Sequence, residues 1–491
     1  MLRFGELTRR VGVVALMRAV PPATALVTNM ILARTLSKEI NGEVQKVLII
    51  VQVASLVGAF GIQTSLYYFL PRLRPEEKRS FVLQSFALVM AIGMALANAI
   101  YTQAGKVATW LQQPALSDAI EVGAITVFAA LLGMLADPLF IAERRAGLGL
   151  AVAVGAGAFQ VVWLAVVSWP PAAQALGFAS ASREQQIRMI VWAFAIAHGL
   201  RWLAALGFAL LCLPKGRLFP AGLSLLAQQI AYILPVGLTS ALDTISSWLD
   251  RTLIARFYSS ADLAVYTYGA IEIPFIAVVT GAVAPVLLPH FSGLLAQNQR
   301  DEVLAVWHRA VRKGGLILFG LFFFFLWLAE DFLVVLYSER YRESSLYFRI
   351  YLTLLPLRII AFMPMLFALG RTRWVLTGAI GEIVLNLGLS LLLMLRTPLG
   401  MAGPAIGTVL ATILQMLFYL EGIRRGLLVG WRNVLPWQAL AMDFLRAAGW
   451  LFPLALLPAS GFPPLIALSI GGFVYATYLW VVALPNLRAE E

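Results

Sequence analysis

The stretch FAIAHGLRWLAALGFALLCL, residues 194–213, places Arg201 inside a long apolar run. With the residues before it, the run covers about 188–213 and is long enough to cross a bilayer as a helix. A guanidinium at the centre of such a helix costs about 2.5–3.5 kcal/mol on insertion scales. His198 lies one turn earlier on the same helical face. The stretch therefore predicts a membrane-spanning helix, and the free-energy cost of inserting Arg201 indicates a functional role for that residue.

The composition of the whole chain points to a membrane protein. Of the 491 residues, 60% are hydrophobic and only 13% are charged, and the mean hydropathy is +0.84. A soluble protein needs more polar surface than this composition supplies. The net charge of +12 does not indicate nucleic-acid binding here, because the basic residues lie in short loops between apolar stretches. The single cysteine, Cys212, excludes an internal disulfide and a cysteine metal cluster.

Apolar stretches of spanning length recur along the chain, about fourteen in all. Their approximate limits are 11–33, 44–70, 81–104, 119–142, 147–169, 188–213, 224–248, 263–289, 310–329, 346–369, 374–395, 401–420, 438–457 and 463–484. Prolines at 21 and 22 and at 356 and 364 predict bends in two of these helices. The predicted fold class is an all-α polytopic membrane protein.

The loops between these stretches predict the orientation. With the N-terminus inside, 22 of the 37 Lys and Arg residues fall in inside loops or tails, and 10 fall in outside loops. Basic residues accumulate on the cytoplasmic side of membrane proteins. We therefore expect both termini in the cytoplasm.

The chain also shows signs of an internal repeat, at offsets near 220–230 residues. The matching segments are Ile31–Arg34 with Leu253–Arg256, Phe69–Arg72 with Leu287–His290, and Arg144–Arg145 with Arg371–Arg373. Three weak matches in the same order indicate two six-helix bundles related by a parallel repeat, as in many transporters. The expected domains are 1–218, 219–425, and an additional C-terminal helix pair with its tail over 426–491.

The sequence shows no motif for enzymatic chemistry. It contains no phosphate-binding G-x-x-x-x-G-K-[ST] loop and no nucleophile motif. His198, His290 and His308 are too far apart in sequence to make a metal-binding pattern. We therefore expect no catalytic residues, no metal site and no bound cofactor, and a protein that is not an enzyme.

Arginines at membrane depth are the candidate site residues. Arg18 lies just before the two prolines of the first stretch, Arg201 near the middle of 188–213, and Arg358 and Arg349 in 346–369. The guanidinium fork makes bidentate hydrogen bonds to phosphate, so several arginines lining a cavity would hold a diphosphate. The alternative is that each arginine pairs with a carboxylate such as Asp137 or, for Arg349 near the outer surface, extends to the lipid headgroups.

Carboxylates at comparable depth are candidates for ion coupling: Glu272, Glu382 and Asp243. An intramembrane carboxylate can carry a proton or coordinate sodium and so couple transport to an ion gradient. The alternative is a salt bridge to one of the arginines.

Loose motifs spread over nearly the whole chain carry a family resemblance. Residues 31–42, ILARTLSKEING, are followed by FGIQTSLYYFLPR at 60–72. Asp250 follows the stretch 224–248, and Asn386, Gly400, Gly403, Ala405, Gly407 and Thr408 fit an "LN…GxxGxAxxT" pattern. This ordered set resembles the polysaccharide-transporter (Wzx-type) branch of the multidrug/oligosaccharidyl-lipid/polysaccharide exporter (MOP) superfamily.

The resemblance implies two six-helix bundles around a cationic cavity, with extra C-terminal helices. It implies alternating-access transfer of an undecaprenyl-diphosphate-linked oligosaccharide across the bacterial inner membrane for surface polysaccharide synthesis. The implied partners are that lipid-linked substrate, membrane lipid, and polysaccharide polymerase and chain-length proteins. Asn41, where the family commonly has an aromatic residue, leaves the subfamily open. The alternatives are a lipid II flippase of peptidoglycan synthesis, a cation-coupled multidrug exporter, and a membrane scaffold that transports nothing.

Overall fold

Helices make up nearly all of the chain that the structure describes. The computed structural model describes residues 4–169, 182–214, 223–271, 287–360 and 362–489, and no strand occurs among them. Thirteen helices in these ranges are long and apolar enough to cross a membrane. The predicted all-α polytopic membrane fold is confirmed. The predicted stretch 263–289 lies partly outside the described residues.

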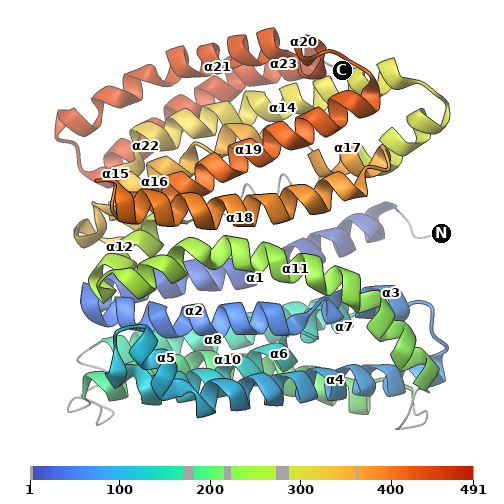
Figure 1. Ribbon diagram of the computed structural model, residues 1–491, viewed down its shortest axis with the longest axis vertical. Helices are drawn as coiled ribbons and strands as arrows, with labels where there is room; N and C mark the ends of the chain where they lie inside the picture. Colours follow the sequence, from blue (N-terminus) through green and yellow to red (C-terminus); the bar gives the residue numbers. More distant parts are fainter. Residues whose placement is uncertain (1–3, 170–181, 215–222, 272–286, 361, 490–491) are drawn as a thin grey trace. The chain divides into compact units, whose positions relative to one another are not determined.

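Two compact units make up the chain, Met1–Ala264 and Val265–Glu491. The long helices of the first unit run side by side (Figure 1). Its elements are α1 (Phe4–Thr35), α2 (Lys38–Ala59), α3 (Ile62–Phe69), α4 (Pro75–Thr102), α5 (Ala104–Trp110), η1 (Pro114–Leu116), α6 (Ser117–Gly133), α7 (Ala136–Ala142), α8 (Ala146–Ser168), α10 (Arg183–Leu211) and α11 (Leu223–Phe257). The predicted domain boundaries at 218 and 425 stay predictions.

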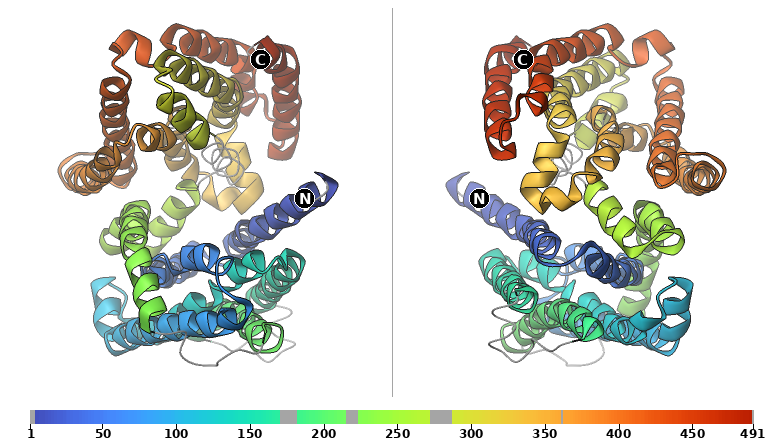
Figure 2. Two further views of the ribbon diagram at one scale, coloured as in Figure 1. Left: turned by 90° about the vertical axis from the view of Figure 1, so that its right-hand side faces the viewer. Right: turned by 90° about the vertical axis from the view of Figure 1, so that its left-hand side faces the viewer.

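The second unit also consists of helices, and Figure 2 shows it from two further sides. The boundary between the units falls within α12 (Ser260–Gly269), whose last five residues belong to the second unit. Its elements are the short helix Leu287–Ala296, α14 (Arg300–Trp327), α15 (Ala329–Tyr337), η2 (Glu339–Tyr341), α16 (Ser344–Leu352), η3 (Leu355–Ile359), α17 (Phe362–Ala368), α18 (Thr372–Arg396), α19 (Ala402–Leu427), α20 (Trp431–Val434), α21 (Trp437–Leu451), η4 (Phe452–Leu456), η5 (Pro458–Ser460), α22 (Pro464–Tyr478), η6 (Leu479–Ala483) and α23 (Leu484–Ala489).

Proline acts differently in the two helices for which bends were expected. α1 continues as a helix through Pro21 and Pro22. The predicted stretch 346–369 is instead divided into α16, the 3₁₀ segment η3 and α17. Pro356 lies in η3, where its missing N–H cannot continue an α-helical ladder. Irregular backbone at membrane depth is tolerated where protein or water satisfies its polar groups.

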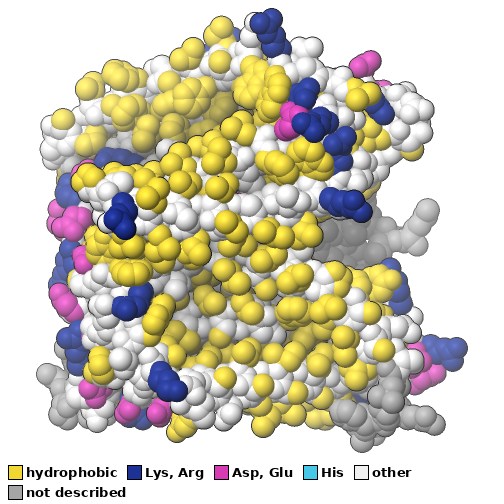
Figure 3. Space-filling model, in the orientation of Figure 1, with side chains coloured by type: hydrophobic (Ala, Val, Ile, Leu, Met, Phe, Trp, Pro, Cys, Tyr) yellow, Lys and Arg dark blue, Asp and Glu magenta, His cyan; other side chains and the backbone are white. Residues whose placement is uncertain are grey.

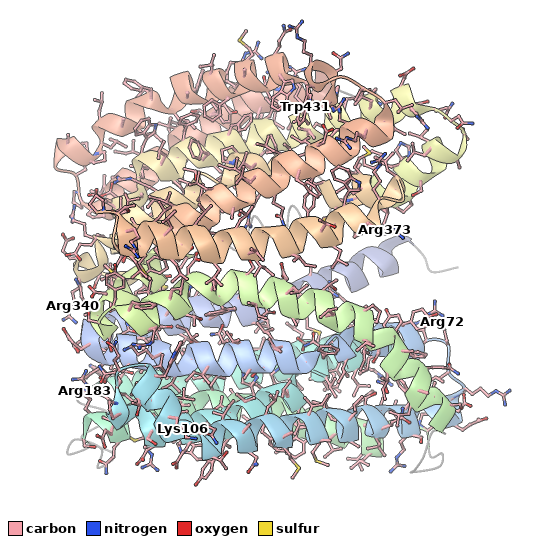
Figure 4. All side chains as sticks on the ribbon, in the orientation of Figure 1. Arg72, Lys106, Arg183, Arg340, Arg373 and Trp431 are labelled. Carbon is pink, nitrogen blue, oxygen red and sulfur yellow. The ribbon has the colours of Figure 1, made fainter. Side chains whose placement is uncertain are left out.

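Side chains are distributed as expected for membrane-spanning bundles. In the first unit, hydrophobic side chains dominate the face over α2, α4 and α11 (Figure 3). Arg72 lies at the opposite end of this unit from Lys106 and Arg183, and Arg373 lies at the opposite end of the second unit from Arg340 (Figure 4). Within each unit, loops predicted to be inside and outside therefore lie at opposite ends.

The first turns of α2 are buried although they are polar. Residues 41–47 are all buried, and the Lys46 ammonium donates a hydrogen bond to the Leu111 carbonyl oxygen at 2.9 Å. Gly42 lies so close to the Ser260 carbonyl group that a Cβ atom would overlap its oxygen. A glycine is therefore needed here for backbone contact rather than for a turn.

Gly42→Ala is expected to destabilise the first unit by about 1–3 kcal/mol, since the added methyl group must displace backbone. Gly155→Ala on α8 is the matched control, because no atom lies within 4 Å of a Cβ at that position. Thermal unfolding of the purified protein in detergent measures both variants. Equal midpoints for Gly42→Ala and Gly155→Ala would contradict the close contact.

In the second unit, a buried carboxylate holds α21 against α14. Asp443 has no exposed surface, and its two oxygens accept from Arg312 Nε at 2.9 Å and Arg446 Nη1 at 3.1 Å. The Tyr478 hydroxyl donates to the Leu316 carbonyl oxygen at 2.7 Å. The C-terminal helices α21 and α22 are thus attached to α14 by polar bonds as well as by apolar packing.

Candidate functional site

Arg201 lies in an ion pair in the first unit. Its Nη2 atom is 2.7 Å from Oδ2 of Asp137 on α7. The two side chains are 15% and 24% exposed, so the pair is neither sealed in the core nor fully open. The Arg201 Nε atom is buried and has no hydrogen-bond partner among the described residues. Because the Arg201 side chain is 15% exposed, the rest of its guanidinium stays open to a further anion.

Backbone packing fixes the position of this part of α10. A Cβ atom on Gly133, at the end of α6, would lie 2.7 Å from the His198 carbonyl oxygen. The glycine allows α6 and α10 to touch one turn before Arg201. α7 begins three residues after Gly133 and carries Asp137. This close contact places the carboxylate beside the arginine.

Arg18 and Tyr67 extend the same cluster. The Arg18 guanidinium lies 6.0 Å from the centre of the Tyr67 ring and acts electrostatically on its hydroxyl. The Asp137 carboxylate also acts electrostatically on Tyr67. Arg18 is exposed on α1, within the spanning segment Gly12–Thr35. We call Arg18, Tyr67, Asp137 and Arg201 the arginine cluster.

The depth of the cluster follows from the helix rise. Arg201 lies ten residues before the end of α10, and Arg18 six residues after the start of its spanning segment. At 1.5 Å per residue, Arg201 is about 15 Å from the end of α10 that is predicted to be inside, and Arg18 is about 9 Å from the start of its spanning segment. The cluster therefore lies in the half of the membrane predicted to be cytoplasmic.

The arginine cluster can bind an anion. The cluster holds two guanidiniums and one carboxylate, so one positive charge is left uncompensated. Charge-assisted bonds from guanidinium to phosphate are bidentate and about twice as strong as neutral ones. The Tyr67 hydroxyl adds a neutral donor. The arrangement fits a phosphate or diphosphate group better than a cation.

Arg358, the third predicted arginine, lies in the second unit. It is half-buried on η3, in the 3₁₀ interruption between α16 and α17. Discontinuous helices commonly form the binding sites of transporters. Its role in substrate binding stays a prediction.

Arg349, the fourth, lies on α16 in a charged network at the end predicted to be outside. Its Nη1 atom is 3.3 Å from Oε1 of Glu330, and its Nε donates to the Leu326 carbonyl oxygen at 3.3 Å. Glu330 also pairs with Arg342 at 3.2 Å. Local partners thus account for this arginine, and its substrate role stays a prediction.

Next to this network lies a carboxylate whose charged form is disfavoured, Asp331, and this gives a testable pH effect. Burial raises the pKa of Asp331, and the neighbouring Glu330 adds to the rise. A raised carboxyl pKa costs stability at neutral pH, and this cost is removed as the pH falls through the folded-state pKa. Asp331→Asn is therefore expected to raise the unfolding midpoint slightly at pH 7 and to change it less at acidic pH.

Glu339→Gln is the control for this prediction, because its hydrogen bond to Arg342 lowers the pKa of Glu339. The Glu339 carboxylate therefore contributes stability to the fold at neutral pH, and this contribution is lost as the pH falls. The two substitutions should thus show opposite pH trends in thermal unfolding. A lower midpoint for Asp331→Asn at pH 7 would refute the assignment.

Glu382 lies in a buried polar ladder between α18 and α19. Glu382, Asn386 and Ser390 follow one another at intervals of four residues, and Asn386 donates to Glu382 at 3.4 Å. Asn386 Oδ1 accepts from Ser390 at 2.9 Å and from Thr408 of α19 at 3.0 Å. Glu382 is only 7% exposed. A buried carboxyl with hydroxyl and amide neighbours suits a proton or a small cation.

The other two predicted coupling carboxylates are not part of this ladder. Asp243 is exposed on α11, in the first unit. Glu272 lies outside the described residues. Their coupling roles stay predictions.

Tyr67 and Thr408 are site residues that the sequence did not single out. Tyr67 comes from a helix separated from Arg18 by more than forty residues, and no periodicity connects the two. Thr408 belonged to a family motif but had no assigned role. The two family motifs that contain these residues, FGIQTSLYYFLPR at 60–72 and the GxxGxAxxT pattern, were the available signal.

Solved structures show which class of protein has this fold. The lipid II flippase MurJ in an inward closed conformation is similar with a TM-score of 0.72 at 14% identity, covering 97% of this chain and 99% of MurJ. A multidrug resistance MATE family transporter in an inward-facing conformation has a TM-score of 0.63 at 14% identity, covering 87% and 99%. A MOP superfamily transporter from Pyrococcus furiosus has a TM-score of 0.53 at 15% identity, covering 85% and 94%. The chain is a multi-pass membrane protein with the fold of MOP superfamily transporters.

The sequence itself matches one family model. Residues 174–346 match the polysaccharide biosynthesis protein family, which is about a third of the chain. No curated protein sequence matches the chain. The resemblance that the sequence motifs indicated is confirmed in two parts: residues 174–346 match polysaccharide biosynthesis proteins, and the fold is that of MOP superfamily transporters.

Proposed function

We propose that the protein is a flippase that moves an undecaprenyl-diphosphate-linked oligosaccharide from the cytoplasmic to the outer leaflet of a bacterial inner membrane. The product would supply surface polysaccharide synthesis, such as O-antigen, capsule or exopolysaccharide. The termini would be cytoplasmic, as the loop charges predict. The match of residues 174–346 to polysaccharide biosynthesis proteins supports this pathway.

The arginine cluster supports this function most directly. Arg18 and Arg201 would hold the diphosphate, which stays near the membrane interface because the prenyl chain is anchored in lipid. Their depth in the half predicted to be cytoplasmic suits the leaflet in which the substrate starts. Arg358 and Arg349 are predicted to contact the substrate during alternating access. A cationic site of this kind is unsuited to organic cations, which argues against multidrug export.

Ion coupling belongs to the proposal as well. Glu382 is the best-supported carboxylate, because its ladder with Asn386 and Thr408 can exchange a proton or a sodium ion. Asp243 and Glu272 are proposed with it from the sequence alone. Polysaccharide polymerase and chain-length proteins are the expected functional partners.

Deletion of the gene, followed by analysis of surface polysaccharide and lipid-linked intermediates, tests the proposal. We expect loss of the polysaccharide and accumulation of the diphosphate-linked intermediate on the cytoplasmic side. Normal polysaccharide with altered drug tolerance would refute it. Lipid II flipping is a second candidate, supported by the fold similarity to MurJ. Deletion would then block peptidoglycan synthesis and lyse the cells instead.

A further inference from the structure

His198 is a titratable group next to the arginine cluster that the proposed function does not use. It lies one turn before Arg201 on α10, and Arg201 acts on its imidazole electrostatically. Its Nδ1 atom is buried and has no hydrogen-bond partner among the described residues. An imidazole nitrogen in this position can take up a proton without breaking an existing bond.

The charges around His198 come mainly from the cluster itself. On the elements packed against α10, α7 carries Asp137 as its one charged residue and α8 carries none. The other charged residues on these elements are either paired elsewhere or lie in the first two turns of their helices. The paired ones are Glu43 with Arg183, Lys46 with the Leu111 carbonyl, Lys78 with Glu143, and Asp118 with Arg188. Those in the first two turns are Lys38, Glu39, Glu76, Glu77, Arg79 and Glu121.

We propose that His198 binds a proton together with the diphosphate group of the substrate and releases both together. This inference rests on the proposed function, because it takes the diphosphate to lie on Arg18 and Arg201. The proton comes from water that reaches the partly exposed Arg201 and Asp137, and it returns to water when the anion leaves. No covalent bond forms or breaks other than the N–H bond of the imidazolium.

Charge balance gives the direction of this coupling. Without substrate, Arg18, Arg201 and Asp137 leave one net positive charge, and a protonated His198 would add a second one beside Arg201. A diphosphate diester brings two negative charges, so the same proton then neutralises the site. Like charges disfavour protonation and opposite charges favour it. Anion binding and proton binding therefore assist one another, to the same extent in both directions.

The test measures proton uptake during binding to the full-length protein in lipid nanodiscs. The probe is undecaprenyl-diphosphate-N-acetylglucosamine, whose diphosphate diester does not titrate near neutral pH. Calorimetry in buffers of different ionisation enthalpy, between about pH 6 and 8, counts the protons taken up. For the wild type we expect uptake of up to one proton per probe and a Kd that rises up to ~10-fold per pH unit.

His198→Gln cannot titrate and is expected to bind the probe with a pH-independent Kd and without this uptake. His308→Gln is the matched control, because His308 lies in the second unit and bonds the Val434 carbonyl instead. It should behave as the wild type does. Binding by the wild type without proton uptake, or unchanged uptake in His198→Gln, would overturn the inference alone. Failure of the wild type to bind the probe at any pH would overturn the proposed diphosphate site, and this inference with it.

Discussion

Arg201→Gln is expected to lower transport at least about 100-fold, whereas Asp137→Asn is expected to retain it. The two side chains form the 2.7 Å ion pair of the first unit. A charged hydrogen bond contributes about 1.5–3 kcal/mol, and truncating one at a buried charge pair costs about 2–5 kcal/mol. If Arg201 binds the diphosphate, Asp137→Asn leaves the guanidinium in place and removes the negative charge beside it.

The double variant Arg201→Gln/Asp137→Asn separates the two roles of the arginine. An arginine that only neutralises Asp137 would be dispensable once the carboxylate is gone, so the double variant would regain transport. An arginine that binds substrate cannot be replaced in this way, and we expect the double variant to stay inactive. Complementation of a deletion strain measures transport, and membrane levels of each variant control for insertion. Arg201→Lys should retain part of the activity, since it keeps the charge and loses the fork.

Asp443→Ala is expected to destabilise the second unit by about 3–5 kcal/mol. The carboxylate has no exposed surface and accepts bonds from both Arg312 and Arg446. Its removal leaves Arg312, which is 26% exposed, without that charge partner. The expected result is a lower unfolding midpoint and loosened packing of α21 on α14.

Asp118→Ala is the control for this prediction. Asp118 also pairs with an arginine, Arg188, but at 3.4 Å and with side chains 59% and 44% exposed. Exposed ion pairs contribute about 0–1 kcal/mol, so its loss should hardly change the unfolding midpoint. If the two alanine variants unfolded at the same temperature, burial of Asp443 would not be the source of its stabilising effect.

Much of the fold could be predicted from the sequence because hydropathy reports membrane spans directly. The apolar run around Arg201 became α10, and Arg201 was expected either to face a cavity or to pair with a carboxylate such as Asp137. The structure contains that pair. The four-residue spacing of Glu382, Asn386 and Ser390 was also present in the sequence, since such residues share one helical face.

Contacts between helices far apart in sequence could not be predicted in this way. The approach of Tyr67 to Arg18 depends on how α1 and α3 pack, which no periodicity encodes. The backbone contact between Gly133 and His198 likewise depends on tertiary packing. The sequence did not single out Asp443, and its two arginine partners became clear only from the fold.

We propose that the arginine cluster holds the diphosphate while the oligosaccharide crosses the membrane. The most direct measurement is transbilayer movement of a fluorescent undecaprenyl-diphosphate oligosaccharide in vesicles reconstituted with the purified protein. We predict movement well above protein-free vesicles, lost with Arg201→Gln and absent for a glycolipid that lacks the diphosphate. Movement that is equal with and without the diphosphate, or equal in Arg201→Gln and the wild type, would contradict the claim.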